Sequence, residues 1–195
     1  AKQRPSHLVA PIIHMTVDEV AEVLSSHLGQ KLPPDAGTLA KAARAALREK
    51  FRTADMGITG ANFVVAETGT ICIISNEGNA RLTSTTPPIH VAIAGIEKVI
   101  PRLADLPVFL KLLARAATGQ KMSVYTSLIT GPRRADELDG PKEFHLILLD
   151  NGRTKVMNGP YQRILRCIRC GACLNVCPVY RQVSGHAYGH VYPGP

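Results

Sequence analysis

Residues 62–75, NFVVAETGTICIIS, contain the strongest signal for the fold. Two short runs, NFVVAE and TICIIS, are rich in β-branched and other apolar residues, and the turn-forming pair Thr68 and Gly69 separates them. The sequence therefore predicts two β-strands joined by a tight turn. The hydrophobic period before residue 62 is helical, so a strand-rich region begins here.

Helical patterns lie on both sides of this region. Residues 16–29 predict a helix, because Thr16 and Glu19 form a capping box and Gly29 can end the helix. Residues 38–57 predict a second helix, and residues 104–119 predict a third with a proline in its first turn. These helices flank apolar runs on a chain with no internal repeat.

Further strands are predicted at HVAIAG (residues 90–95), KMSVYTSLITG (121–131) and FHLILLD (144–150). The last is apolar enough to predict burial on both faces. The polar residues 76–88 predict a loop, and NGRT at 151–154 predicts a hairpin turn. Helices mixed with apolar strands favour an α/β fold, three-layered, over residues 1–156, with residues 157–195 as a small appended segment.

Composition limits the class of protein. The chain has 195 residues, of which 45% are hydrophobic and none is tryptophan, so we expect an aliphatic core. No apolar run approaches the roughly 20 residues that span a bilayer, and clustered cysteines favour a reducing cytoplasm. The net charge of +8 is dispersed, without the aromatic–basic interleaving of single-strand nucleic-acid binders. We therefore expect no membrane span and no nucleic-acid partner.

Four of the five cysteines lie within RCIRCGACLNVCPVY, residues 166–180. Cys167, Cys170, Cys173 and Cys177 have the spacing Cys-x2-Cys-x2-Cys-x3-Cys, and a proline follows. Structural zinc sites usually take cysteine pairs from two separated knuckles, whereas this run is the bacterial ferredoxin pattern. The motif predicts a [4Fe–4S] cluster on these four thiolates, with a zinc knuckle or free thiols as the alternatives.

In two-cluster ferredoxins the fourth cysteine of such a run ligates the other cluster. The printed chain has no second run, and its remaining cysteine, Cys72, lies in an apolar strand where we expect an inert thiol. The chain therefore carries either one complete single-cluster site or half of a two-cluster module.

Two long stretches of the chain, residues 56–101 and 166–195, resemble the lactate-utilisation iron–sulfur proteins. These are the B subunits of a three-part bacterial L-lactate oxidation system. The resemblance implies a lactate-utilisation (LUD) domain, distantly similar to the sugar-phosphate isomerase and CoA-transferase fold, followed by a ferredoxin-like segment. It also implies truncation at both ends, with a second cysteine run beyond residue 195. On this basis Cys167, Cys170 and Cys173 would share one cluster with a later cysteine, and Cys177 would serve a second cluster.

The strand-end loops of the α/β region contain the other candidates, because such loops are where α/β folds place ligands. The predicted substrate-binding residues are Thr68, Gly69, Asn76, Gly78 and Asn79. Glu67 and Glu77 are the catalytic candidates, as a base or, by analogy with CoA-transferases, as a nucleophile. The alternative is that these residues form ordinary turns with solvated glutamates.

Three histidines and one lysine are weaker candidates. His90 and Lys98 lie in the same region, where His90 is expected to start a strand. His186 and His190 have the spacing of zinc ligands on a helix, but the surrounding glycines and a proline predict a loop.

The resemblance implies an iron–sulfur electron-transfer subunit of a complex that oxidises L-lactate to pyruvate, with the other subunits as partners. The chain would then be part of an oxidoreductase rather than a complete enzyme. The alternative is that the α/β domain is itself an enzyme, acting on a small organic acid or acyl thioester through Glu67 or Glu77. The sequence leaves open whether lactate binds this chain.

Overall fold

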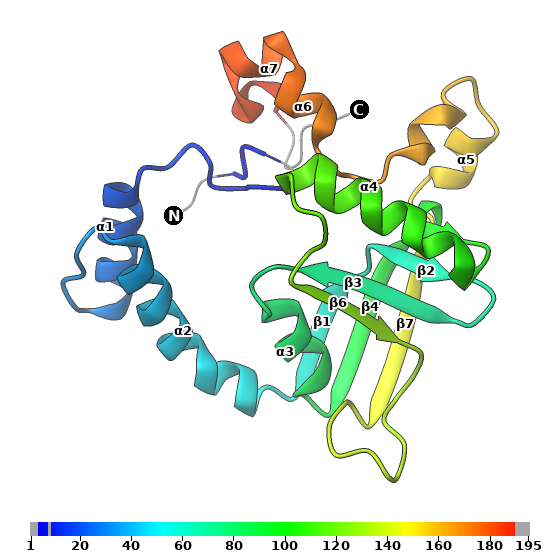
Figure 1. Ribbon diagram of the computed structural model, residues 1–195, viewed down its shortest axis with the longest axis horizontal. Helices are drawn as coiled ribbons and strands as arrows, with labels where there is room; N and C mark the ends of the chain where they lie inside the picture. The colour runs from blue at the N-terminus through cyan, green and yellow to red at the C-terminus, as the bar shows by residue number, and fades with distance from the viewer. Residues whose placement is uncertain (1–3, 8, 190–195) are drawn as a thin grey trace. The chain divides into compact units, whose positions relative to one another are not determined.

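The computed structural model describes residues 4–7 and 9–189 (Figure 1). Its contacts form two compact units, one of Ala1–Lys50 with Gly171–Pro195 and one of Phe51–Cys170. The first unit joins the beginning of the chain to its end. The boundary expected between residues 156 and 157 stays a prediction about domains.

The Phe51–Cys170 unit contains two β-sheets. The parallel sheet has three strands in the order β1 (Met56–Gly60), β4 (Ile89–Gly95) and β7 (Glu143–Leu149). The mixed sheet has four strands in the order β5 (Val99–Ile100), β2 (Phe63–Val65), β3 (Thr70–Ser75) and β6 (Tyr125–Ile129). The strands β2 and β3 are antiparallel and pair Phe63 with Cys72, which confirms the predicted tight turn between them.

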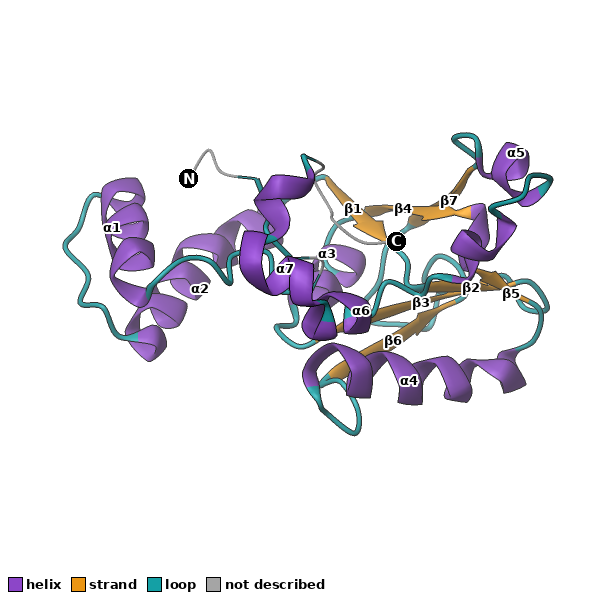
Figure 2. Ribbon diagram, turned by 90° about the horizontal axis from the view of Figure 1, so that it is seen from above, coloured by secondary structure: helices purple, strands orange, loops and turns teal. Residues whose placement is uncertain are grey.

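The two sheets and one helix form three layers (Figure 2). The sheets pack against each other through a cluster that includes Val64, Ile71 and Ala92. On its other face, the mixed sheet packs against α4 (Leu106–Thr118) through Phe63 and Leu113. The α/β class and the aliphatic core are confirmed, with the strands divided between two sheets.

The parallel sheet has one exposed face, so the predicted double burial of the strand at residues 144–150 is wrong. Phe144 and Leu146 of β7 pack inward against the other sheet. Ile147 is 47% exposed on the outer face, and Ile58 of β1 is 60% exposed. An apolar run alone does not say whether a second layer covers the strand.

Three short elements differ from the sequence prediction. The predicted loop contains α3 (Asn79–Thr85), which begins at Gly78 with φ +76°. Instead of a hairpin turn, Gly152 begins α5 (Arg153–Met157). A strand, β1, replaces the expected end of the second helix, and a Cβ on its Gly57 would overlap the Thr83 carbonyl of α3. This close approach is a tertiary contact that local propensity does not encode.

The helices of the other unit agree better with the sequence. The helix α1 (Val17–Leu28) has the full capping box of Thr16 and Glu19, and it ends at Gly29 with φ +66°. The helix α2 (Ala36–Thr53) follows and continues into the next unit. No helix among the described residues is long and apolar enough to cross a membrane.

Candidate metal centre and strand-end loops

The first two cysteines of the motif belong to the Phe51–Cys170 unit. The 3-10 helix η3 (Gln162–Arg166) leads into Cys167. Ile168 and Cys170 pack against the buried cluster beneath α4, which contains Ile100 and Leu106. This half of the motif is therefore held by apolar packing on the α/β core.

The last two cysteines belong to the other unit and lie on two short helices. Cys173 is exposed on α6 (Ala172–Val176). Cys177 caps α7 (Pro178–Val183), where its Sγ accepts a hydrogen bond from the Tyr180 backbone N–H at 3.4 Å. This hydrogen bond is the largest cause that lowers the pKa of the Cys177 thiol, so the local backbone favours the thiolate.

The segment at residues 4–14 holds these two helices through polar contacts. The Tyr180 hydroxyl donates to the Ser6 carbonyl at 2.6 Å. His7 is 4% exposed, and its Nδ1 accepts hydrogen bonds from the backbone N–H groups of Val9 and Ala10, each at 3.1 Å. Its Nε2 must therefore carry the proton, which it donates to Asn175 Oδ1 at 3.1 Å.

Two of the weaker candidates, His186 and His190, follow these helices in the chain. His186 lies in η4 (Gly185–Tyr188), donates from Nε2 to the Arg4 carbonyl at 2.8 Å and contacts the His14 ring. His190 lies outside the described residues. His186 thus bonds to the segment at residues 4–14.

The donor set fits an iron–sulfur cluster by its chemistry and by its backbone. The four motif ligands are all thiols, which soft iron–sulfur centres prefer. Arg169 and Gly171 have φ of +60° and +75°, so the backbone turns tightly within the cysteine run. Among the described residues, no three His, Cys, Asp or Glu side chains are gathered closely enough to hold a metal ion.

The predicted substrate residues lie at opposite ends of β3. Thr68 and Gly69 form the turn before it, where the Thr68 hydroxyl donates to Thr70 Oγ1 at 2.7 Å. The other group follows the strand: Asn76 Oδ1 accepts the Val124 N–H at 3.1 Å, and Asn79 Oδ1 accepts the Ser75 hydroxyl at 2.9 Å. Because β3 is six residues long, the two groups do not form one pocket.

The remaining predicted residues of these loops have structural contacts. Glu67 Oε2 accepts the Leu103 N–H at 3.0 Å, where it caps the start of η2 (Leu103–Asp105). Glu77 is exposed, and the neighbouring Gly78 lies against the ring of Tyr125. Their roles in catalysis and binding stay predictions.

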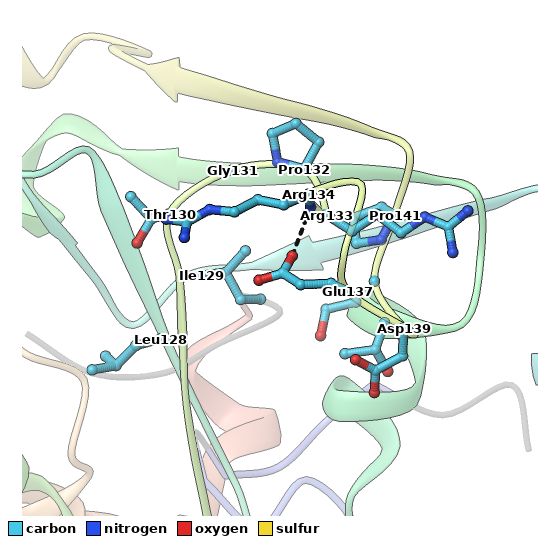
Figure 3. A pocket seen from close by; sticks show the side chains of 13 residues that line it. Leu128, Ile129, Thr130, Gly131, Pro132, Arg133, Arg134, Glu137, Asp139 and Pro141 are labelled. Atoms are coloured by element: carbon cyan, nitrogen blue, oxygen red, sulfur yellow. Dashed lines mark hydrogen bonds between the residues drawn. The ribbon is translucent and has the colours of Figure 1, made fainter.

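A pocket of about 380 Å³ lies beside the end of β6 (Figure 3). It is lined by hydroxyl and charged side chains, including Thr85, Thr130, Arg133, Arg134, Glu137 and Asp139. Glu137 accepts the Arg134 N–H at 2.7 Å, and Thr130 Oγ1 is 3.0 Å from Thr70 Oγ1. The hydroxyls of residues 68, 70 and 130 thus connect the predicted turn to this pocket, which the sequence did not reveal because GPRRADELDGP has the composition of an ordinary loop.

A group of buried charges lies where β4 and β7 end. Glu97 and Arg153 form an ion pair, with side chains 8% and 19% exposed. Lys98, at the end of η1 (Ile96–Lys98), is 9% exposed, and burial is the largest cause that lowers its pKa, followed by Arg169. His90 is fully buried inside β4, where its Nε2 and Thr59 Oγ1 are 2.7 Å apart, so it is a strand residue as expected.

An α/β domain followed by a thiol-only ferredoxin motif defines the class as an iron–sulfur protein with an α/β domain. The family model described as the LUD domain matches residues 5–149, and the model described as the 4Fe-4S dicluster domain matches residues 163–195. The chain belongs to the LUD domain family. Its C-terminal region carries a 4Fe–4S dicluster domain, which confirms the cofactor that the cysteine spacing predicted.

Several curated relatives are similar over nearly the whole chain. It is 50% identical to "Lactate utilization protein B" of Bacillus pumilus and 48% identical to the protein of that name in Macrococcus caseolyticus. It is 47% identical to "Uncharacterized electron transport protein YkgF" of Escherichia coli. Each match covers 98% of this chain and 40% of the relative, so the chain spans well under half of their length.

A search of solved structures finds a DUF162 family protein from Deinococcus radiodurans, with a TM-score of 0.38 and 16% identity. The match covers 68% of this chain and 84% of that one.

Proposed function

We propose that this chain is the electron-carrying, iron–sulfur part of a protein that takes part in the oxidation of L-lactate to pyruvate. The observation that carries the proposal is the ferredoxin spacing of Cys167, Cys170, Cys173 and Cys177 within a region that matches a 4Fe–4S dicluster domain. The names of the relatives, which refer to lactate utilisation and electron transport, support the substrate and the role.

The thiols of Cys167, Cys170 and Cys173 would hold one cluster together with a later cysteine, and Cys177 would serve the second. When bound, the clusters supply one-electron redox chemistry. The chain contributes the ligands and their surroundings. Apolar packing around Cys170 limits water on one side, and the Tyr180 N–H favours the thiolate of Cys177. Partners would be the other subunits of the lactate-oxidising system.

The test is anaerobic reconstitution of this chain beside a version extended past Pro195, with iron and sulfide measured per chain and EPR recorded after reduction. We expect about eight irons in the extended protein and fewer in this chain. Only the extended protein would contain the second cysteine run that completes both clusters. About four irons held stably by this chain alone would mean that its four cysteines form a self-sufficient site. Zinc without redox-active iron in both proteins would overturn the proposal.

The pocket beside β6 favours a second candidate function, in which the α/β domain acts on a small organic acid or acyl thioester. Its volume of about 380 Å³ lies within the usual range for ligand pockets, and the hydroxyl chain connects it to the turn next to Glu67. Glu67→Gln tests a catalytic carboxylate, because a glutamine oxygen can still accept the Leu103 N–H. If this candidate is right, Glu67→Gln loses turnover of the organic acid or acyl thioester while its iron content stays unchanged. Unchanged turnover in that variant would show that Glu67 is not the catalytic residue.

A further inference from the structure

Lys98 is a buried cation whose neighbouring carboxylate already has a partner. The residue is 9% exposed at the end of η1, and lysines this buried are normally paired. Glu97, the next residue in the chain, is ion-paired with Arg153. The charge on Lys98 is therefore only partly balanced by the protein around it.

Two of the charges that act on Lys98 come from the cysteine motif. Arg169 and Arg153 disfavour its ammonium form, while Glu97 and the thiolate of Cys167 favour it. Two cations and one carboxylate that is shared with Arg153 thus act on a buried lysine. A further negative charge at Cys167 would stabilise the ammonium directly, because attraction between charges is strong away from water.

Packing independently brings the segment that follows Lys98 close to the motif. Ile100, two residues after Lys98, belongs to the buried cluster against which Ile168 and Cys170 pack. The segment that runs from Lys98 into β5 and the turn that carries the first two cysteines therefore share one region of the Phe51–Cys170 unit.

We propose that Lys98, a residue of the α/β domain, is a positioning residue that faces the cluster bound at Cys167 and Cys170 and raises its reduction potential. The inference rests on the proposed iron–sulfur function. Reduction adds one electron to a cluster that is already anionic with its thiolate ligands, and no bond forms or breaks. A buried ammonium stabilises the more negative, reduced form, and the cluster supplies the counter-charge that Lys98 lacks.

The test uses the reconstituted protein extended past Pro195, and compares the wild type with Lys98→Met, Lys98→Arg and Lys111→Met in an EPR-monitored redox titration. Lys111 is an exposed residue of α4, so it controls for loss of a lysine elsewhere. In Lys98→Met we expect the ratio of reduced to oxidised cluster at a fixed potential to fall roughly tenfold, which is about 59 mV for a one-electron couple. Lys98→Arg keeps the charge and should stay near wild type, as should Lys111→Met.

Equal potentials in Lys98→Met, Lys111→Met and wild type would overturn the inference while leaving the proposed function intact. Equal shifts in Lys98→Met and Lys98→Arg would also overturn it, because packing rather than charge would then be responsible. If Lys98→Met takes up no iron, Lys98→Gln repeats the test. Iron uptake that requires a lysine or an arginine at position 98 supports the inference, whereas loss of iron in every Lys98 variant counts against it. A wild-type protein without redox-active iron would instead overturn the proposed function.

Discussion

The two halves of the cysteine motif are held by different forces. Ile168 and Cys170 pack on the aliphatic core beneath α4, whereas α6 and α7 are fixed by hydrogen bonds to Ser6 and His7. Core packing is cooperative and independent of metal. Single hydrogen bonds contribute only about 1 kcal/mol net. The comparison therefore predicts that the first two cysteines keep their arrangement without a cluster, while the last two depend more on one.

Truncating the core should have the largest effect on the first half. Leu106 is 2% exposed in the cluster that contacts Ile168 and Cys170, so Leu106→Ala leaves a cavity there. We expect a loss of about 2–5 kcal/mol in the free energy of unfolding, measured by urea denaturation followed by circular dichroism. Leu138→Ala, at a residue 98% exposed, is the control and should change little. Equal stability of the two variants would contradict the view that packing holds this half.

Removing the His7 imidazole should loosen the second half alone. His7→Phe deletes the donor to Asn175 and the acceptor for two backbone N–H groups, at a cost of roughly 1–3 kcal/mol for the donors left unsatisfied. Hydrogen exchange of residues 171–189 should become faster, with residues 51–170 unchanged. His27→Phe, at an exposed position of α1, is the matched control. Faster exchange spread over both units would show that the halves are not independent.

The cysteines themselves should differ in their reaction with iodoacetamide in the metal-free protein. Burial raises the pKa of Cys72 to about 11, so its thiolate is scarce at neutral pH and the thiol should stay unmodified. Cys177, whose pKa is lowered by the Tyr180 N–H, should react at a lower pH than an ordinary thiol. Mass spectrometry of digested samples across a pH series measures both, and early labelling of Cys72 would contradict its burial.

The shifted pKa of Cys72 also makes a smaller prediction about stability. Below pH 9 the thiol is protonated in both the folded and the unfolded chain and contributes no pH dependence. As pH rises from about 9 toward 11, the unfolded chain loses this proton first, so the free energy of unfolding falls. Cys72→Ala removes this part of the pH dependence, and an unchanged profile between pH 8 and 11 would contradict it.

The spacing of residues that are close in sequence determines several features of this protein by itself. The capping box at Thr16, the turn at Gly69 and the ligand chemistry of the cysteine run all depend on residues a few positions apart. Chemistry of that kind is visible in the sequence because the interacting groups are neighbours along the chain.

Tertiary structure alone decided what each of these features contacts. The exposed face of β7, the helix α3 that packs on Gly57, and the hydrogen bond from His7 to Asn175 depend on residues distant in sequence. The burial of Lys98 does so as well. Hydrophobic burial and charge balance are properties of a packed environment, and the environment of a side chain is assembled from segments that the local sequence does not contain.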